Sequence, residues 1–424
     1  MRCPMIGVIA DDVTGGTDAA AALRRRGLRT RLGFGVPTGP AERLPADAAV
    51  LALKTRTAPA ADAVRDALAA ADHLTAAGAS QLYFKFCSTF DSTPRGTIGP
   101  VLDALSARTG ARPVVTAPAT PEHGRTQYLG HLFVHERLLA ESSMRHHPLT
   151  PMTDSLLPRL LDAQSAHPGS AVLDHRTVAA GPVRIRAALD ALAGRARYVF
   201  PDALDDGDLL AVARAVVDAP LVAGAAGLVG ALGAVRAERG LPQHPEGAGP
   251  LRRPGGRAAV LAGSCARRTL EQIDALRAAG RPAHLLDPLA VPDPDALATR
   301  ALRWYDTVDA GAGVLIHASR RPDELRTAQR ALGVARSARI LEAAIGAIAV
   351  GLARRGVARL VVAGGETSGA VVAALGIAGG EVGVEAARGV PWIHPAAGPC
   401  LLLKSGNFGD RRLLLTASAA EGEA

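Results

Sequence analysis

Acidic residues that follow apolar runs are the first candidates for chemistry in this chain. Asp11 and Asp12 come directly after the run Met5–Ala10, and Asp91 follows a later run that ends at Phe86. A carboxylate so placed can accept the proton of a hydroxyl group that attacks phosphorus, or can hold Mg²⁺. Asp11 and Asp12 are also consistent with a helix N-cap and a solvated neighbour, because a helical Ala/Leu pattern follows them.

Basic residues in the same half of the chain could bind a small anionic substrate such as a sugar acid. The candidates are Lys54, Arg56, Lys85, Arg125, His131, Arg145 and His146. Ser88 and Thr89 lie close to Asp91 in the sequence and could order the hydroxyl groups of a polyhydroxy acid. We interpret the adjacent His146 and His147 as residues of a capped loop, because adjacent histidines do not easily ligate one metal ion.

Three loops in the second half of the chain indicate phosphate binding. An apolar run leads into Gly364–Gly369, and similar glycine- and serine-containing loops occur at Gly263–Cys265 and Lys404–Gly409. Glycine lets the backbone approach a phosphate closely, and free N–H groups at a helix start supply positive potential. A strand-to-helix turn without a ligand is the alternative. The chain has neither a GxxxxGK[ST] motif nor a GxGxxG dinucleotide fingerprint.

Lysine and asparagine are rare in this chain and therefore informative. Of 48 basic residues only three are lysines, Lys54, Lys85 and Lys404, and Asn407 is the single asparagine. All four lie in or beside the segments described above. A compact ammonium meets a phosphate or carboxylate differently from a planar guanidinium, so these residues are candidates for roles that arginine cannot fill.

The elements that must position these residues alternate between strand and helix. The strand, polar loop and helix unit that begins at Met5–Ala10 recurs at Ala48–Leu53, Gln81–Phe86 and Pro113–Thr116. Such alternation predicts a parallel sheet with both faces covered. Ligands bind beyond the carboxyl ends of strands in such sheets, so the polar loops should converge on one cleft.

The length of 424 residues predicts two or three domains, and composition indicates where they divide. Residues 238–257 are rich in Pro, Gly and charge, as a linker is. We therefore predict an N-terminal sugar-acid-binding domain over 1–240, a linker over 241–257 and a C-terminal nucleotide-binding domain over 258–424. The expected fold is α/β, with two Rossmann-like domains, mainly parallel sheets and the active site in the interdomain cleft.

Composition also excludes several classes of partner. The net charge of +8 is spread along the chain and aromatic residues make up only 3%, which disfavours a nucleic-acid site built on base stacking. No apolar run is long enough to span a membrane, and the first ten residues do not suit a signal peptide. The four cysteines are scattered, which favours reduced thiols. We expect a cytoplasmic protein without nucleic-acid or membrane partners. Its composition is compatible with a homodimer.

Several of these segments resemble the four-carbon acid sugar kinase family. IADDVTGGTDAAAALRRRGLRT resembles its opening signature, VLAGSC and GGETSGA its nucleotide-domain motifs, and LLLKSGNFG its closing motif. KFCSTFDSTPRGTIGPV, PATPEHGRTQYLGHLFV and ESSMRHHPLTPMTD are similar to the branch of the family that acts on 3-oxo-tetronates. The resemblance runs over nearly the whole chain with the motifs in order.

The resemblance implies transfer of phosphate from ATP, with Mg²⁺, to the 4-hydroxyl of a 3-oxo-tetronate, which yields 3-oxo-tetronate 4-phosphate and ADP. It assigns the sugar acid to the N-terminal domain and ATP to the C-terminal domain. For ATP it implies Ser264, Gly364, Gly365, Glu366, Thr367, Ser368, Gly369 and Gly406. We add Asn407, which lies in the same loop as Gly406.

For the reaction we expect a carboxylate to accept the proton and cations to hold the substrate. Asp91, Asp11 and Asp12 are the candidate proton acceptors, and Asp91 is preferred to Asp12 for its Ser and Thr neighbours. Lys85, Lys54 and Arg125 would bind the carboxylate and the oxo group. The Gly364 loop and Mg²⁺ would stabilise the transferring phosphoryl group.

Three other functions stay open on the sequence. The nearest is a D-threonate or D-erythronate 4-kinase of the same family. An NAD(P)-dependent oxidoreductase would also use two α/β domains, although the dinucleotide fingerprint is missing. A two-domain sugar-acid-binding protein without catalysis is the third, and it would bind the acid but not turn over ATP.

Overall fold

The computed structural model describes residues 5–420, apart from residues 40, 42–45, 148, 241–253, 310 and 312. The chain forms two compact units, Met1–Gly249 and Pro250–Ala424. Most of the linker expected over 241–257 lies outside the described residues. Each unit is α/β around a mainly parallel sheet, which confirms the predicted fold class. The placement of the active site in an interdomain cleft stays a prediction.

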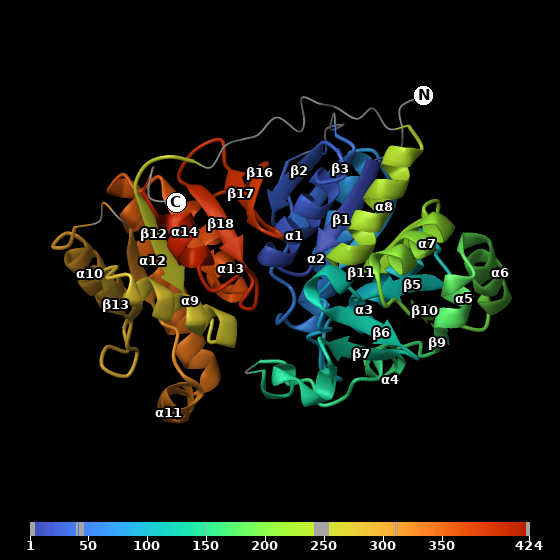
Figure 1. Ribbon diagram of the computed structural model, residues 1–424, viewed down its shortest axis with the longest axis horizontal. Coiled ribbons are helices and arrows are strands. Elements are labelled where there is room, and N and C mark those ends of the chain that lie inside the picture. The colour runs from blue at the N-terminus through green and yellow to red at the C-terminus, as the bar shows by residue number, and fades with distance from the viewer. Residues whose placement is uncertain are drawn as a thin grey trace. The chain divides into compact units, whose positions relative to one another are not determined.

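The first unit is built on one parallel sheet (Figure 1). Its strand order is β2-β3-β1-β4-β11-β5-β10-β9, and all the neighbouring pairs are parallel. The strands are β1 (Met5–Ala10), β2 (Thr30–Phe34), β3 (Ala48–Ala52), β4 (Ala79–Lys85), β5 (Val114–Ala117), β9 (Ser170–Leu173), β10 (Tyr198–Pro201) and β11 (Leu221–Gly224).

Helices cover both faces of this sheet. One layer packs through α1, α8, α7, α6 and α5, and the other packs through α2, α3 and α4. The bounds are α1 (Val13–Arg24), α2 (Ala60–Ala76), α3 (Ile98–Thr109), α4 (Leu157–Asp162), α5 (His175–Ala179), α6 (Pro182–Leu192), α7 (Asp206–Val216) and α8 (Ala226–Glu238). Because both faces are covered, every residue of β1, β3 and β5 is buried, which explains their continuous apolar sequences.

A small antiparallel sheet interrupts this pattern in the segment after β5. It consists of β6 (Arg125–Tyr128), β7 (His131–Val134) and β8 (Arg137–Leu138). Short 3₁₀ turns accompany it at Pro121–His123, Leu139–Glu141 and Ser143–His146. The buried Asp202, which follows β10, accepts hydrogen bonds from the N–H groups of Leu129 and Gly130 at 2.8 and 3.1 Å and so holds the β6–β7 turn.

The second unit has a mixed sheet in the order β13-β14-β12-β15-β18-β17-β16. The strands β12 to β15 and β18 pair in parallel, whereas β17 is antiparallel to both β16 and β18. They are β12 (Ala258–Ala262), β13 (Ala283–Leu285), β14 (Val314–His317), β15 (Arg359–Ala363), β16 (Gly379–Ala387), β17 (Val390–His394) and β18 (Cys400–Lys404).

Helices of the second unit also form two groups. The long α12 packs against α10, α11 and α13, whereas α9 packs against α14. Their bounds are α9 (Arg267–Ala278), α10 (Pro294–Tyr305), α11 (Pro322–Leu332), α12 (Val334–Arg354), α13 (Gly365–Leu375) and α14 (Leu413–Ser418). Among the residues described, no helix combines the length and apolar character needed to cross a bilayer.

The cysteines within the described ranges are free thiols, namely Cys87, Cys265 and Cys400, as the sequence predicts. Cys3 lies outside those ranges. Burial raises the pKa of Cys87 to about 12, so this thiol is protonated at neutral pH and is a poor nucleophile.

Candidate active site

The crossovers of the first unit leave the ends of two neighbouring strands uncovered. After β1 the chain runs through α1 to β2, on one side of β1, whereas after β4 it runs through α3 to β5 on the other side. Parallel sheets bind ligands at such switch points, beyond the carboxyl ends of the strands. Asp11 and Asp12 follow β1 and Lys85 ends β4, so all three lie at this point.

Arg56, which follows β3, joins the two aspartates. Its Nε and Nη2 donate to the Asp11 carboxylate at 2.9 and 2.7 Å, and Nη2 also donates to Asp12 Oδ1 at 2.7 Å. Asp12 caps α1 as well, because it accepts hydrogen bonds from the Gly15 N–H at 2.8 Å and the Thr14 hydroxyl at 2.6 Å. Asp12 is therefore both an N-cap and a member of a charged cluster, and Arg56 is bound to protein carboxylates.

The two aspartates differ in their electrostatics. Burial raises the pKa of Asp11, with a further contribution from the neighbouring Asp12, despite the ion pair with Arg56. Burial would raise the pKa of Asp12 too, but Arg56, Lys85 and the hydrogen bonds from Thr14 and Gly15 hold it below its ordinary value. Asp12 is therefore ionised at neutral pH.

Lys85 is a buried lysine that has no ion-pair partner among the described residues. Only 4% of the residue is exposed, and its ammonium has no hydrogen bond or ion pair to any residue that the structure describes. A Cβ built on Gly15 would lie 2.3 Å from Lys85 Nζ, so the glycine leaves room for the ammonium. Its three N–H donors are available to an anion.

Arg125 at the start of β6 is a second buried cation. It is 9% exposed and donates from Nη1 to the His123 carbonyl oxygen, whereas its Nε has no partner among the described residues. Burial lowers the pKa of Arg125, while Asp91 and Cys87 oppose that shift, which places all three near one another. A guanidinium with unused donors and no ion pair in the described chain suits a carboxylate ligand.

Asp91 presents one open oxygen. Its Oδ1 accepts the Thr89 hydroxyl at 2.7 Å, whereas its Oδ2 lies 4.0 Å from Arg56 Nη1. Burial would raise the pKa of Asp91, but Arg56, His147 and hydrogen bonds from Thr89 and Cys87 hold it below its ordinary value. The carboxylate is ionised at neutral pH, and its Oδ2 is free of hydrogen bonds from nitrogen or oxygen donors in the described residues.

His147 is a residue of this site that the sequence analysis set aside. Its Nδ1 accepts the backbone N–H of Thr150 at 3.1 Å and lies 2.8 Å from the Thr150 hydroxyl, so the proton of the neutral ring is on Nε2. The ring contributes to the pKa of Asp91, which places His147 near that carboxylate. The adjacency of His146 and His147 gave no sign of this, because only the fold brings the loop towards Asp91.

The other residues predicted to bind the substrate are not members of the charged cluster of Asp11, Asp12, Arg56 and Lys85. Ser88 is half-buried in the loop with Thr89, and Lys54 is exposed just beyond β3. His131 bonds to the Leu129 carbonyl oxygen at the turn of the β6–β7 hairpin, three pairs away from Arg125. Arg145 is exposed and donates to the Ala140 carbonyl oxygen at 3.2 Å. In the described part of the chain, His131 and Arg145 share no hydrogen bond or ion pair with the charged cluster.

The second unit has its own switch point, between β12 and β15. From β12 the chain crosses to β13, and from β15 it crosses to β16 in the opposite direction. The loops of Ser264 and Gly364 follow these two strands, and the loop of Gly406 and Asn407 follows β18 next to them. A Cβ on Gly406 would lie 2.5 Å from Ser264 Oγ, so two of the three predicted loops are in contact.

The Gly364 loop, which follows β15, leads directly into the start of α13. Gly364 adopts a φ of +125° and is the N-cap of α13, which contains Gly365, Glu366, Thr367, Ser368 and Gly369. The first N–H groups of a helix lack intrahelical partners and attract anions. Ser368 Oγ is buried without a hydrogen-bond partner among the described atoms. Close backbone approach, free N–H groups and an unused hydroxyl together fit a phosphate ligand.

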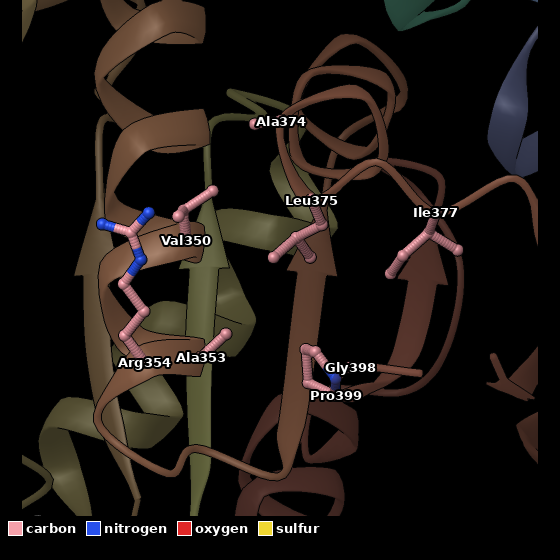
Figure 2. A pocket seen from close by; sticks show the side chains of 8 residues that line it. All are labelled: Val350, Ala353, Arg354, Ala374, Leu375, Ile377, Gly398 and Pro399. Atoms are coloured by element: carbon pink, nitrogen blue, oxygen red, sulfur yellow. The ribbon is translucent and has the colours of Figure 1, made fainter. Parts of the chain in front are cut away.

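An apolar hollow of about 290 Å³ also lies in the second unit, but at the other end of the strands. Figure 2 shows Val350 and Arg354 on α12, Leu375 at the end of α13, and Pro399 just before β18. These positions are at the amino end of β18, so the hollow is separate from the Gly364 and Gly406 loops. It offers one charged side chain and otherwise aliphatic walls.

Comparisons with known proteins match both units. A family model described as a sugar-binding N-terminal domain matches residues 6–232, and one described as a nucleotide-binding C-terminal domain matches residues 259–414. A 3-oxo-tetronate kinase of Pseudomonas fluorescens is 43% identical over 96% of this chain and 95% of its own length. The Salmonella typhimurium 3-oxo-tetronate kinase is 42% identical over 97% of this chain and 98% of its own.

A solved structure is similar over the same length. A crystal structure from Salmonella typhimurium LT2, described as that of a candidate tRNA synthase, is 40% identical with a TM-score of 0.83. The similarity covers 98% of this chain and 99% of that one.

Replacing Gly15 by Ala should displace the Lys85 ammonium and disturb the Asp12 carboxylate. The new methyl group would meet Lys85 Nζ and Asp12 Oδ1, each at 2.3 Å, so the flexible end of the lysine must move aside and the cap of α1 must shift. We expect kcat/KM for the acceptor substrate to fall at least about tenfold, and the melting temperature to fall because Asp12 loses part of its hydrogen bonding. Gly230→Ala on α8 is the control, since its methyl would meet only ordinary contacts at 3.4 Å and longer. Equal kinetics in both variants would contradict the role of Lys85.

Replacing Arg56 by Met should destabilise the first unit in a pH-dependent way. Asp11 and Asp12 would remain buried without the guanidinium, and we expect a loss of about 3–5 kcal/mol at pH 8. In the native protein the pKa of Asp12 is lower than in the unfolded chain. This difference stabilises the fold at pH values above the pKa of the unfolded state, and the stabilisation is lost as the pH falls through the pKa of the folded state. In the variant both carboxyls have raised pKa values, so the deficit should shrink between pH 8 and pH 5.

Urea unfolding followed by circular dichroism at both pH values measures this difference. Arg65→Met is the control, because Arg65 pairs with Asp62 on the exposed surface of α2 and its loss should matter little at either pH. A deficit for Arg56→Met that is the same at pH 5 and pH 8 would argue against two buried carboxylates held by one guanidinium.

Proposed function

This chain belongs to the four-carbon acid sugar kinase family, and from that premise we propose that it phosphorylates the 4-hydroxyl of a 3-oxo-tetronate with ATP. The names of its curated relatives support this substrate. In the reaction a bond forms between O4 and the γ-phosphorus, the bond from that phosphorus to the oxygen shared with ADP breaks, and the hydroxyl proton is released. The observation that carries the proposal is a pair of buried cations, Lys85 and Arg125, that have no ion-pair partner among the described residues, in the same unit as the open carboxylate oxygen of Asp91.

We assign the two substrates to the two domains. Residues 1–240 would bind the sugar acid and residues 258–424 the nucleotide, with 241–257 as the linker, in agreement with the descriptions of the matching family models. The expectations of a cytoplasmic enzyme and of a homodimer go with this proposal. They can be tested by cell fractionation and by light scattering of the purified protein.

The sugar acid would be held mainly by charge. A tetronate carries one carboxylate, and Lys85 and Arg125 offer unused donors to it and to the 3-oxo group. Ser88 and Thr89 would contact the hydroxyl groups, and the exposed Lys54 would reach the substrate only from the solvent side. Arg56 would act through Asp11 and Asp12, because both carboxylates are bound to it.

Asp91 is the proton acceptor that the geometry supports best. Asp12 is engaged by Arg56, Thr14 and the Gly15 N–H, and both Asp11 oxygens are bound by Arg56. Asp91 Oδ2, in contrast, is free for a substrate hydroxyl. The lowered pKa of Asp91 keeps it ionised, which an acceptor requires.

ATP would bind at the loops of the second domain. Ser264, the residues from Gly364 to Gly369, Gly406 and Asn407 offer backbone N–H groups and hydroxyls to its phosphates. Mg²⁺ would enter with ATP, because this ion is usually held by substrate phosphates, water and one or two carboxylates. When bound, it neutralises the charge of the transferring phosphoryl group.

A coupled assay for ADP release tests the proposed reaction. Purified protein with Mg·ATP is offered 3-oxo-tetronates made in situ by a dehydrogenase, D- and L-threonate, and D- and L-erythronate. We expect turnover with the oxo acids alone. Turnover on an unoxidised tetronate alone would move the chain to another branch of the family, and no turnover on any acid would overturn the kinase proposal.

Replacing Asp91 by Asn tests the proton acceptor. The amide keeps the shape of the side chain but cannot accept the hydroxyl proton, so we expect kcat to fall by about 10²–10⁴. The KM for ATP should stay within about threefold, because the nucleotide residues belong to the other domain. Asp72→Asn is the matched control, since it makes the same exchange at an exposed carboxylate of α2 that pairs with Arg108, and it should leave kcat unchanged. A kcat within about tenfold of wild type would exclude Asp91 as the acceptor.

A further inference from the structure

Lys404 is a buried lysine at the root of a predicted nucleotide loop. It is the last residue of β18 and is 0% exposed. Its Nζ donates to Thr269 Oγ1 at 2.9 Å and to the Gly406 carbonyl oxygen at 3.0 Å. The amine therefore connects the loop after β18 to the first turns of α9.

These bonds set the orientation of one peptide group in the loop. Thr269 Oγ1 also donates to the Gly406 carbonyl oxygen, at 2.7 Å, so that oxygen is held by two donors. In a trans peptide the N–H of the next residue points away from the carbonyl. The Asn407 N–H, which no other described group accepts, thus points away from α9, and Gln272 anchors the end of the loop through the Phe408 and Asp410 carbonyl oxygens.

The charge of Lys404 has no acidic partner among the described residues. Burial and the nearby Arg268 lower the pKa of Lys404 to about 7. Glu271 on α9 pairs with Arg268 at 2.8 Å, and neither Glu366 on α13 nor Asp410 in the loop forms an ion pair with Lys404. Both hydrogen bonds of Nζ are donated, so a neutral amine can make them as well as an ammonium can.

We propose that Lys404 is a positioning residue of the nucleotide loop that takes up a proton when the phosphates of ATP or ADP bind. The inference rests on the proposed function, which puts phosphates at the Gly406 loop. Negative charge arriving there favours the ammonium, and by linkage the ammonium then favours the nucleotide. Arginine cannot do this, because it stays protonated and would leave a buried, uncompensated charge in the empty protein.

Calorimetric titration of the full chain with Mg·ADP at pH 8 tests the proposal. Repeating it in two buffers of different ionisation enthalpy gives the number of protons taken up. We expect a net uptake of protons by the complex, because a group with a pKa of about 7 is mostly neutral at pH 8 in the empty protein and the phosphate charge raises that pKa on binding. Above pH 7 the Kd for Mg·ADP should rise by up to about tenfold per pH unit.

Three variants separate charge from structure. Lys404→Met should abolish the uptake and weaken ADP at least about tenfold. Arg268→Gln removes the repelling charge, raises the pKa of Lys404 in the empty protein and should reduce the uptake at pH 8. Thr269→Val removes the hydroxyl that holds Gly406 but keeps the amine, so the uptake should persist.

The outcomes distinguish this proposal from the proposed function. Absence of ADP binding by the wild-type protein would overturn the nucleotide site itself. Binding with the same heat in both buffers would overturn the role of Lys404 and leave the kinase proposal standing. Uptake that survives in Lys404→Met would assign the proton to another group and overturn the proposal as well.

Discussion

Asp11 and Asp12 are consecutive buried carboxylates, and the first domain depends on the Arg56 guanidinium that offsets their mutual repulsion and their loss of solvation. Arg56 bonds to both Asp11 and Asp12, and it reaches them from the loop after the neighbouring strand β3. The same pair of carboxylates sits beside Lys85 at the end of β4. Three strand ends are thus fixed relative to one another by charge, at the point where the crossovers leave the sheet edge uncovered. Asp91 approaches that cluster, with its Oδ2 4.0 Å from Arg56 Nη1.

In the proposed function the two domains would bind anions by opposite means, and the difference suits the substrates proposed for them. The first places fixed side-chain charges in a buried setting, where an unpaired cation gains much from a single small carboxylate. The second offers backbone N–H groups at a helix start and close approach at glycines, which spread binding over several phosphate oxygens. A small acid has few atoms to hold, so point charges select it. A nucleotide has many, and backbone N–H groups can contact several of its phosphate oxygens at once.

Much of this arrangement could be predicted from apolar runs and the polar residues that end them. The prediction of Met5–Ala10 coincides with β1, and Ala48–Leu53 and Gln81–Phe86 differ from β3 and β4 by one or two residues. The β6–β7 hairpin and the antiparallel β16 were missed. The hairpin strands are short and contain Arg and His, and the nine-residue β16 contains several Gly and Glu residues, so neither has the apolar pattern of a buried parallel strand. Side-chain partners could not be predicted either, because no local pattern shows that Arg56 is bound to two aspartates or that His147 lies near enough to Asp91 to affect its pKa.

The scarcity of lysine acquires a physical meaning in the structure. Arginine has replaced lysine almost everywhere, and an exposed or ion-paired position tolerates that exchange, since only the sign of the charge matters there. Lys85 and Lys404 are buried, and neither has an acidic ion-pair partner in the described residues. A guanidinium at Lys85 would need more room than Gly15 leaves, and at Lys404 it could not lose its charge in the empty protein. Two of the three lysines therefore persist where size or titration, and not charge alone, is required.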